Sequence, residues 1–168
     1  MDATHLHLML THFPIVGTIV GVGILAYGHF SNNNSIKKVA LVTFFLMSIL
    51  TIPVFLTGEG AEEAVEHFAG VSEKIIEEHE ELAEKAIWLM GLLGIISVLN
   101  IFLIIKKSSF AKSASLIALI ISVATVGLFV QVGNLGGQIR HSEIRANSGQ
   151  LNDPGSISSG SDQHSNDN

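Results

Sequence analysis

The sequence lacks cysteine and has few charged residues. None of its 168 residues is a cysteine, and only 14% are Asp, Glu, Lys or Arg. A chain without cysteine forms no disulfides, no thiolate metal or iron–sulfur sites, and no covalent haem attachment through C-x-x-C-H. The net charge of −6 also leaves no basic footprint for nucleic acid. Any haem would therefore be bound non-covalently, and we expect no nucleic-acid partner.

Common enzyme motifs are missing as well. The chain has no phosphate-binding glycine loop, nucleophile elbow or H-E-x-x-H sequence. The Glu-x-x-His spacing of di-iron bundles fails, because Ile76 precedes His79 by three residues and Ala64 precedes His67 by three. We therefore expect that the chain is not an enzyme on its own.

Apolar residues are abundant. They make up 48% of the chain, and the mean hydropathy is +0.48, which is too apolar for an ordinary soluble domain. Each of four apolar runs is long enough to cross a bilayer once as a helix. We predict an all-α, up-down-up-down four-helix bundle in a lipid bilayer, formed by one membrane domain (1–145) and followed by a disordered polar tail (146–168). The predicted spans are residues 14–30, 39–57, 86–105 and 113–132.

Two prolines and a glycine pair lie in the first two runs. We predict that Pro14 lies in the first turn of its helix, where proline is tolerated, and that Pro53 bends the second helix. The spacing Gly17-x-x-x-Gly21 lets another helix approach closely.

An acidic segment, residues 58–85, separates the second and third runs and contains ten of the fifteen acidic residues. We predict a helical cap with a break at Gly70, where Ser72 caps a new helix and Glu73 lies at its positive end. That helix would continue into the third run and carry His79 with it.

The charges predict the topology. The two short connections between runs contain only basic charged residues, whereas every Asp and Glu lies in the N-terminus, the cap or the C-terminus. The positive-inside rule places the short connections in the cytoplasm and the cap and both termini outside. Residues 1–11 lack the basic start of a secretory signal, so we expect them to be retained. The basic residues of the connections are Lys37, Lys38, Lys106, Lys107 and Lys112.

Most histidines are then expected at the outer end. His12 would lie at the edge of the hydrocarbon, and the helical rise puts His79 and His141 roughly 10 and 13 Å above the spans. Neutral imidazole ligates both metals and haem, and bundles hold such sites between helices. A buried histidine bonded to a carbonyl or a glutamate explains His79 equally well. The candidate cofactor-binding residues are His7, His12, His79 and His141.

A transition-metal site is the alternative. The acidic cap would collect divalent cations, and His12 and His79 would select the metal. His67 follows Glu63 by one turn, a spacing that chelates metals but also occurs in ordinary surface pairs. We assign no role to His29.

The fourth helix has a polar stripe if it continues past Val132. The stripe would line the outer mouth opposite His79, unless the helix ends at the Gly136-Gly137 pair. Its residues are Gln131, Asn134, Gln138, His141 and Arg145.

The segment from His7 to Ile15, HLMLTHFPI, resembles the H-P-x-L-V-H-F-P-I signature of a bacterial four-span membrane family, domain of unknown function 2231. A histidine also tends to open the third helix of that family, which corresponds to His79. Leu8 replaces the family's second-position proline. The resemblance implies a bacterial inner-membrane protein whose matching positions are His7, His12 and His79, but it implies no reaction.

Three functions fit these observations. The first is electron transfer through b-type haem, with a quinone or a periplasmic carrier as partner. The second is binding or sensing of a transition metal. The third is a structural or assembly subunit without a cofactor, in a homo-oligomer or a membrane complex, whose acidic cap docks a basic protein.

Overall fold

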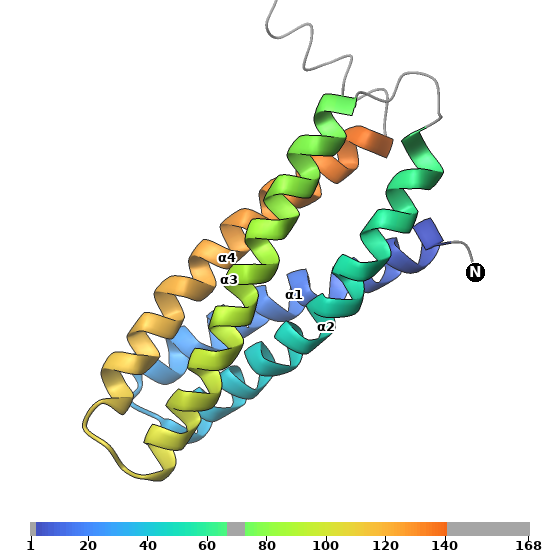
Figure 1. Ribbon diagram of the computed structural model, residues 1–168. Helices are drawn as coiled ribbons and strands as arrows, with labels where there is room; N and C mark the ends of the chain where they lie inside the picture. Colours follow the sequence, from blue (N-terminus) through green and yellow to red (C-terminus); the bar gives the residue numbers. More distant parts are fainter. Residues whose placement is uncertain (1–2, 67–72, 141–168) are drawn as a thin grey trace, which may run out of the picture.

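The computed structural model describes residues 3–66 and 73–140, and this part of the chain is all-α, as predicted. Figure 1 shows its helices running alongside one another, with the α1–α2 and α3–α4 connections at the same end. All are long and apolar enough to cross a membrane. They are α1 (Ala3–Phe30), α2 (Asn34–Glu66), α3 (Glu73–Ile105) and α4 (Ala111–Arg140).

Each helix packs on the next one along the chain, and α1 also contacts α4. From Ala86 to Ile104 the buried residues of α3 recur at intervals of three and four, with Gly94 buried beside Leu93, which keeps one stripe facing its neighbours. His79 falls on the same stripe, between Ile76 and Ala86. The residues Ile76, Ala86, Met90, Leu93, Ser97, Asn100 and Ile104 form this stripe.

The two short connections share one geometry. Asn32 and Lys107 both have positive φ angles, 52° and 51°. In each connection the next backbone N–H, from Asn33 or Ser108, donates to a carbonyl five residues earlier. This is the Schellman ending of a helix. The side chains of Asn33 and Ser108 then accept hydrogen bonds from the first turn of α2 and the residue before α4. The bundle is therefore two similar helical hairpins.

The prediction for Pro14 is wrong. α1 begins at Ala3, so Pro14 lies inside the helix, where it is buried. A proline removes one intrahelical hydrogen bond. The helix nevertheless continues on both sides of Pro14, and His7 in the part before it bonds to α2. The prediction that Gly17 and Gly21 admit a neighbouring helix is confirmed. A Cβ on Gly17 would collide with Met47, and one on Gly21 with Phe44.

The cap is helical where it is described, because α2 continues to Glu66 and α3 begins at Glu73. The predicted break at Gly70 and the capping residue Ser72 lie outside the described residues. The tail 146–168 lies outside them too.

Candidate functional site

His7 links α1 to α2. Its half-buried ring donates the Nδ1 hydrogen to the carbonyl oxygen of Val54 at 3.0 Å, and Nδ1 lies 3.2 Å from the Thr57 hydroxyl. Gly58 of α2 lies beside the ring, since a Cβ there would be 3.6 Å from His7 Cε1. The ring is thus held against a stretch of helix that a glycine keeps open.

His79 repeats this arrangement between α3 and α4. Its half-buried ring donates the Nδ1 hydrogen to the carbonyl oxygen of Val132 at 3.0 Å. A Cβ on Gly136 would lie 3.3 Å from His79 Cε1. In both hairpins the accepting carbonyl belongs to a valine four residues before the glycine.

The hydrogen bonds determine the tautomer of both rings. A carbonyl oxygen only accepts, so Nδ1 must carry the hydrogen and Nε2 of a neutral ring keeps its lone pair. Ligating histidines are usually held in this way, by an Nδ1–H bond to a carbonyl or carboxylate. His7 and His79 both lie at the end of the bundle away from the short connections. Each hairpin therefore orients one imidazole at this end.

The second hairpin is about one turn longer than the first. Asn32 follows His7 by 25 residues and precedes Val54 by 22, whereas Lys107 follows His79 by 28 and precedes Val132 by 25. Both arms are longer by three residues, so the histidine and the carbonyl stay level within each hairpin. The same histidine–carbonyl pair is built twice.

The structure does not bring His12 to this site. Its side chain is exposed and donates the Nδ1 hydrogen to the Leu8 carbonyl of its own helix at 2.7 Å. His67 and His141 lie outside the described residues, as does the side chain of Glu63. Within residues 3–66 and 73–140, no three His, Asp or Glu side chains are placed to hold a metal ion.

Only part of the predicted stripe on α4 can be placed, because His141 and Arg145 lie outside the described residues. α4 continues through Gly136 and Gly137 to Arg140, so the alternative of an earlier helix end is wrong. Gln131 and Asn134 are nevertheless exposed, because the register of α4 turns Phe129, Val132 and Gly136 inward. Gln138 is half-buried and bonds to Asn134 at 2.7 Å. Sequence analysis missed Val132 and Gly136, the residues that do contact His79.

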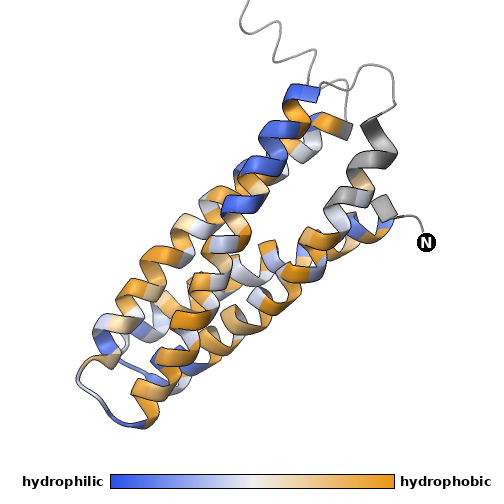
Figure 2. Ribbon diagram, viewed as in Figure 1, coloured by the Kyte–Doolittle hydropathy of each residue, from blue (hydrophilic) through white to orange (hydrophobic). Residues whose placement is uncertain are grey.

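The glutamates of α3 form a solvated face. Most are exposed, and two make intrahelical ion pairs, Lys74 with Glu78 at 3.7 Å and Lys85 with Glu81 at 2.8 Å. Exposed pairs of this kind contribute little stability. Figure 2 shows these hydrophilic turns of α3 at the end of the bundle away from the short connections.

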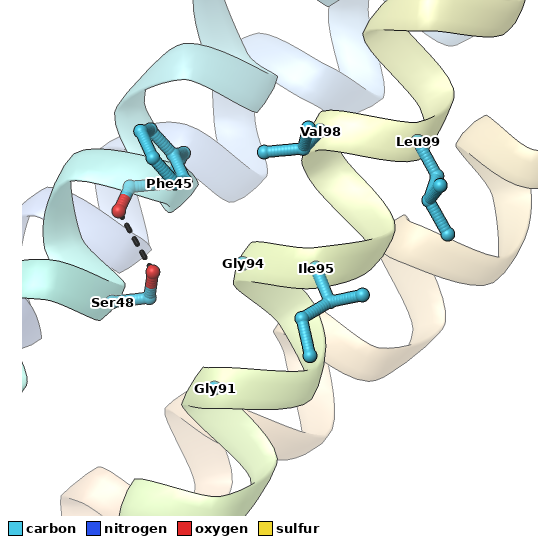
Figure 3. Close-up of a pocket in the computed structure, with 7 residues that line it drawn as sticks. All are labelled: Phe45, Ser48, Gly91, Gly94, Ile95, Val98 and Leu99. Carbon is cyan, nitrogen blue, oxygen red and sulfur yellow. Dashed lines mark hydrogen bonds between the residues drawn. The ribbon is translucent and has the colours of Figure 1, made fainter.

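A shallow pocket lies on the α2–α3 face, away from both histidines (Figure 3). Its only hydroxyl, on Ser48, donates to the Phe45 carbonyl oxygen at 2.7 Å, so the pocket offers no free polar group. The lining residues are Phe45, Ser48, Gly91, Gly94, Ile95, Val98 and Leu99.

Comparisons with known proteins give no match, either among family models, among curated proteins or among solved structures. The resemblance of residues 7–15 to the four-span membrane family stays a prediction.

Proposed function

We propose that this chain is a multi-pass protein of the bacterial inner membrane. Large apolar side chains such as Phe30, Leu56 and Phe110 are more than two-thirds exposed, whereas polar side chains such as Thr18, Ser97 and Asn100 are fully buried. This distribution suits a lipid environment, in which apolar side chains gain nothing from burial and small polar ones pack between helices. The lysine-rich connections support a cytoplasmic position for that end, with both termini and the acidic cap outside.

We further propose that His7 and His79 bind b-type haem, for electron transfer with a quinone or a periplasmic carrier. The observation that carries this proposal is the pair of Nδ1–H bonds to the carbonyl oxygens of Val54 and Val132. With Nδ1 protonated, the lone pair on each Nε2 atom is available to ligate haem iron. When bound, haem supplies reversible one-electron chemistry. The chain contributes the two imidazoles, their orientation and a largely apolar setting that raises the cost of an unbalanced charge.

The number of ligands favours haem over a bare metal ion. Structural zinc sites take four protein ligands and catalytic ones three. Haem needs only axial ligands from the protein, and two histidines suffice. In the described part of the chain, the arrangement of side chains provides two imidazoles and no third ligand. A metal site would require Glu63, His67 or His141.

The first experiment is an absorption spectrum of the full chain, purified in mild detergent from haem-supplemented cells. We expect a Soret band and sharpened α and β bands on reduction with dithionite. His7→Ala and His79→Ala should each lose the reduced α band. His12→Ala is the matched control, because it removes an exposed histidine from the same helix as His7, and it should keep the spectrum.

Glycine variants test the orientation of His79 without removing it. A Cβ on Gly136 presses on the ring, whereas a Cβ on Gly137 meets nothing within 4 Å. Gly136→Ala should shift the reduced spectrum or lower haem occupancy, and Gly137→Ala should do neither. A featureless wild-type spectrum would reject haem. Elemental analysis of the same sample would then separate a metal-binding module, with stoichiometric metal, from a structural subunit with none.

A further inference from the structure

A cluster of basic side chains lies at the opposite end of the bundle from His7 and His79. His29 is in the last turn of α1, Lys37 in the first turn of α2, and Lys112 in the first turn of α4. α1 packs against both α2 and α4, and a Cβ on Gly28 would lie 3.1 Å from Lys37 Cγ. The positive charge of Lys112 acts on both His29 and Lys37. Three helices therefore place cationic or basic groups together.

Two of these side chains are enclosed by the bundle. Lys37 is 3% exposed and His29 is 9% exposed. Nδ1 of His29 is buried and has no hydrogen-bond partner in the described part of the chain. A buried polar atom without a partner is costly, and an enclosed lysine normally has a counter-charge. Gly28 keeps α1 close enough to enclose Lys37, since a Cβ there would lie 2.9 Å from the Lys37 backbone nitrogen.

No glutamate of the described helices lies near this basic cluster. Residues 3–58 and 85–142 contain no Asp or Glu. Glu59 is the first carboxylate after Lys37, 22 residues along, which is about 33 Å of helix. Both ion pairs in the described residues lie in the acidic part of α3. The described helices therefore supply no carboxylate as a counter-charge for Lys37.

The backbone adds to the positive potential. α2 and α4 both begin at this end, so the positive ends of two helix dipoles face the region that holds the three side chains. We propose that the basic cluster of His29, Lys37 and Lys112 binds a phosphate group, either the headgroup of an anionic lipid or a free phosphate ion. This site is independent of the proposed haem ligands.

The test compares adjacent lysines in the purified full chain. Lys37→Gln and Lys38→Gln remove the same charge from the same turn, but Lys37 is buried whereas Lys38 is only partly buried. Retention of phosphatidylglycerol over phosphatidylcholine from mixed vesicles is measured by native mass spectrometry. We expect Lys37→Gln to weaken retention at least tenfold and Lys38→Gln less than twofold. Equal losses would show only general attraction to an anionic surface and would overturn the proposal.

Two further variants keep the test decisive. Lys112→Gln changes an exposed side chain and should weaken retention about fivefold, even if Lys37→Gln fails to fold. Lys37→Arg keeps the charge and should stay within threefold of wild type. Thermal stability in detergent with and without millimolar inorganic phosphate distinguishes the sources. If phosphate stabilises wild type but not Lys112→Gln, and no lipid is retained, the ligand is a free phosphate ion. If lipid is retained and phosphate does not stabilise the protein, the ligand is a lipid headgroup. If wild type neither retains lipid nor is stabilised by phosphate, the proposed site is refuted.

Discussion

The contact between α2 and α3 gives the sharpest stability prediction. A Cβ on Gly94 would collide with the Ser48 hydroxyl and lie 2.8 Å from Ser48 Cβ, whereas a Cβ on Gly91, one turn away, meets nothing within 4 Å. Two carbon atoms need about 3.5–4.0 Å, so Gly94→Ala must push the two helices apart. Rotating Ser48 does not relieve the collision, because its Cβ is fixed to the backbone.

The expected magnitude follows from comparing the two glycines. Overpacking costs about 1–3 kcal/mol, while alanine gains up to about 1 kcal/mol over glycine in a helix. Both variants share the propensity gain, so it cancels in their difference. Gly94→Ala should therefore be about 1–3 kcal/mol less stable than Gly91→Ala. Unfolding in detergent is followed by helical circular dichroism and by the fluorescence of Trp88, the only tryptophan.

The double variant Ser48→Gly/Gly94→Ala provides the internal check. Removing the Ser48 side chain removes the collision, so the double variant should recover at least about 1 kcal/mol relative to additive single effects. If Gly94→Ala and Gly91→Ala have equal stability, the close approach of α2 and α3 that places the hairpins together is incorrect.

Three other predictions test the interior, a turn and the topology. Asn100 pairs with the Ser115 hydroxyl at 3.0 Å inside the bundle, so Asn100→Ala should cost about 1–2 kcal/mol, and an additive double variant with Ser115→Ala in thermal unfolding would contradict the pairing. Lys107 adopts a left-handed conformation, so Lys107→Gly should raise the free energy of unfolding by about 1 kcal/mol. Asn32→Gly should raise it less, because asparagine tolerates this conformation better than lysine. The reverse order in denaturant titrations would refute this reasoning. Because the chain has no cysteine, Ser109→Cys gives a unique thiol. An impermeant maleimide should label it in inverted vesicles but not in intact cells. Labelling in intact cells would show that the topology is the reverse of the one proposed.

The helices were predictable because their evidence is repeated along the chain. Four long apolar runs, separated by short polar connections, are enough to predict an all-α bundle. The ends were harder. An apolar run taken as the whole helix puts Pro14 in a first turn, but α1 extends eleven residues further towards the N-terminus. Those added turns contact α2, as the bond of His7 to Val54 shows, and proline removes only one intrahelical hydrogen bond.

The candidate site was only half predictable, for a chemical reason. Imidazoles are visible in a sequence, so His7 and His79 were both identified as candidates. Their partners are backbone carbonyls, which every residue has, so Val54 and Val132 carry no mark of their role. Side-chain polarity was a misleading guide to the partners of His79. Gln131 and Asn134 were predicted to face His79, but both are exposed. The available clue was a glycine four residues after each accepting carbonyl.

The histidines at the two ends of the bundle have different hydrogen bonds and different charged neighbours. His7 and His79 have their Nδ1 atoms bonded, which leaves a paired set of lone pairs near the acidic cap. His29 has a buried Nδ1 without a described partner, beside enclosed Lys37, in a region with no carboxylate from the helices. The first arrangement suits an electrophile such as the proposed haem iron, and the second suits an anion such as the proposed phosphate. The two hairpins have similar backbones, so the backbone alone does not make the two ends different. The difference comes from the distribution of charge along the helices, with glutamates confined to one end and lysines largely at the other.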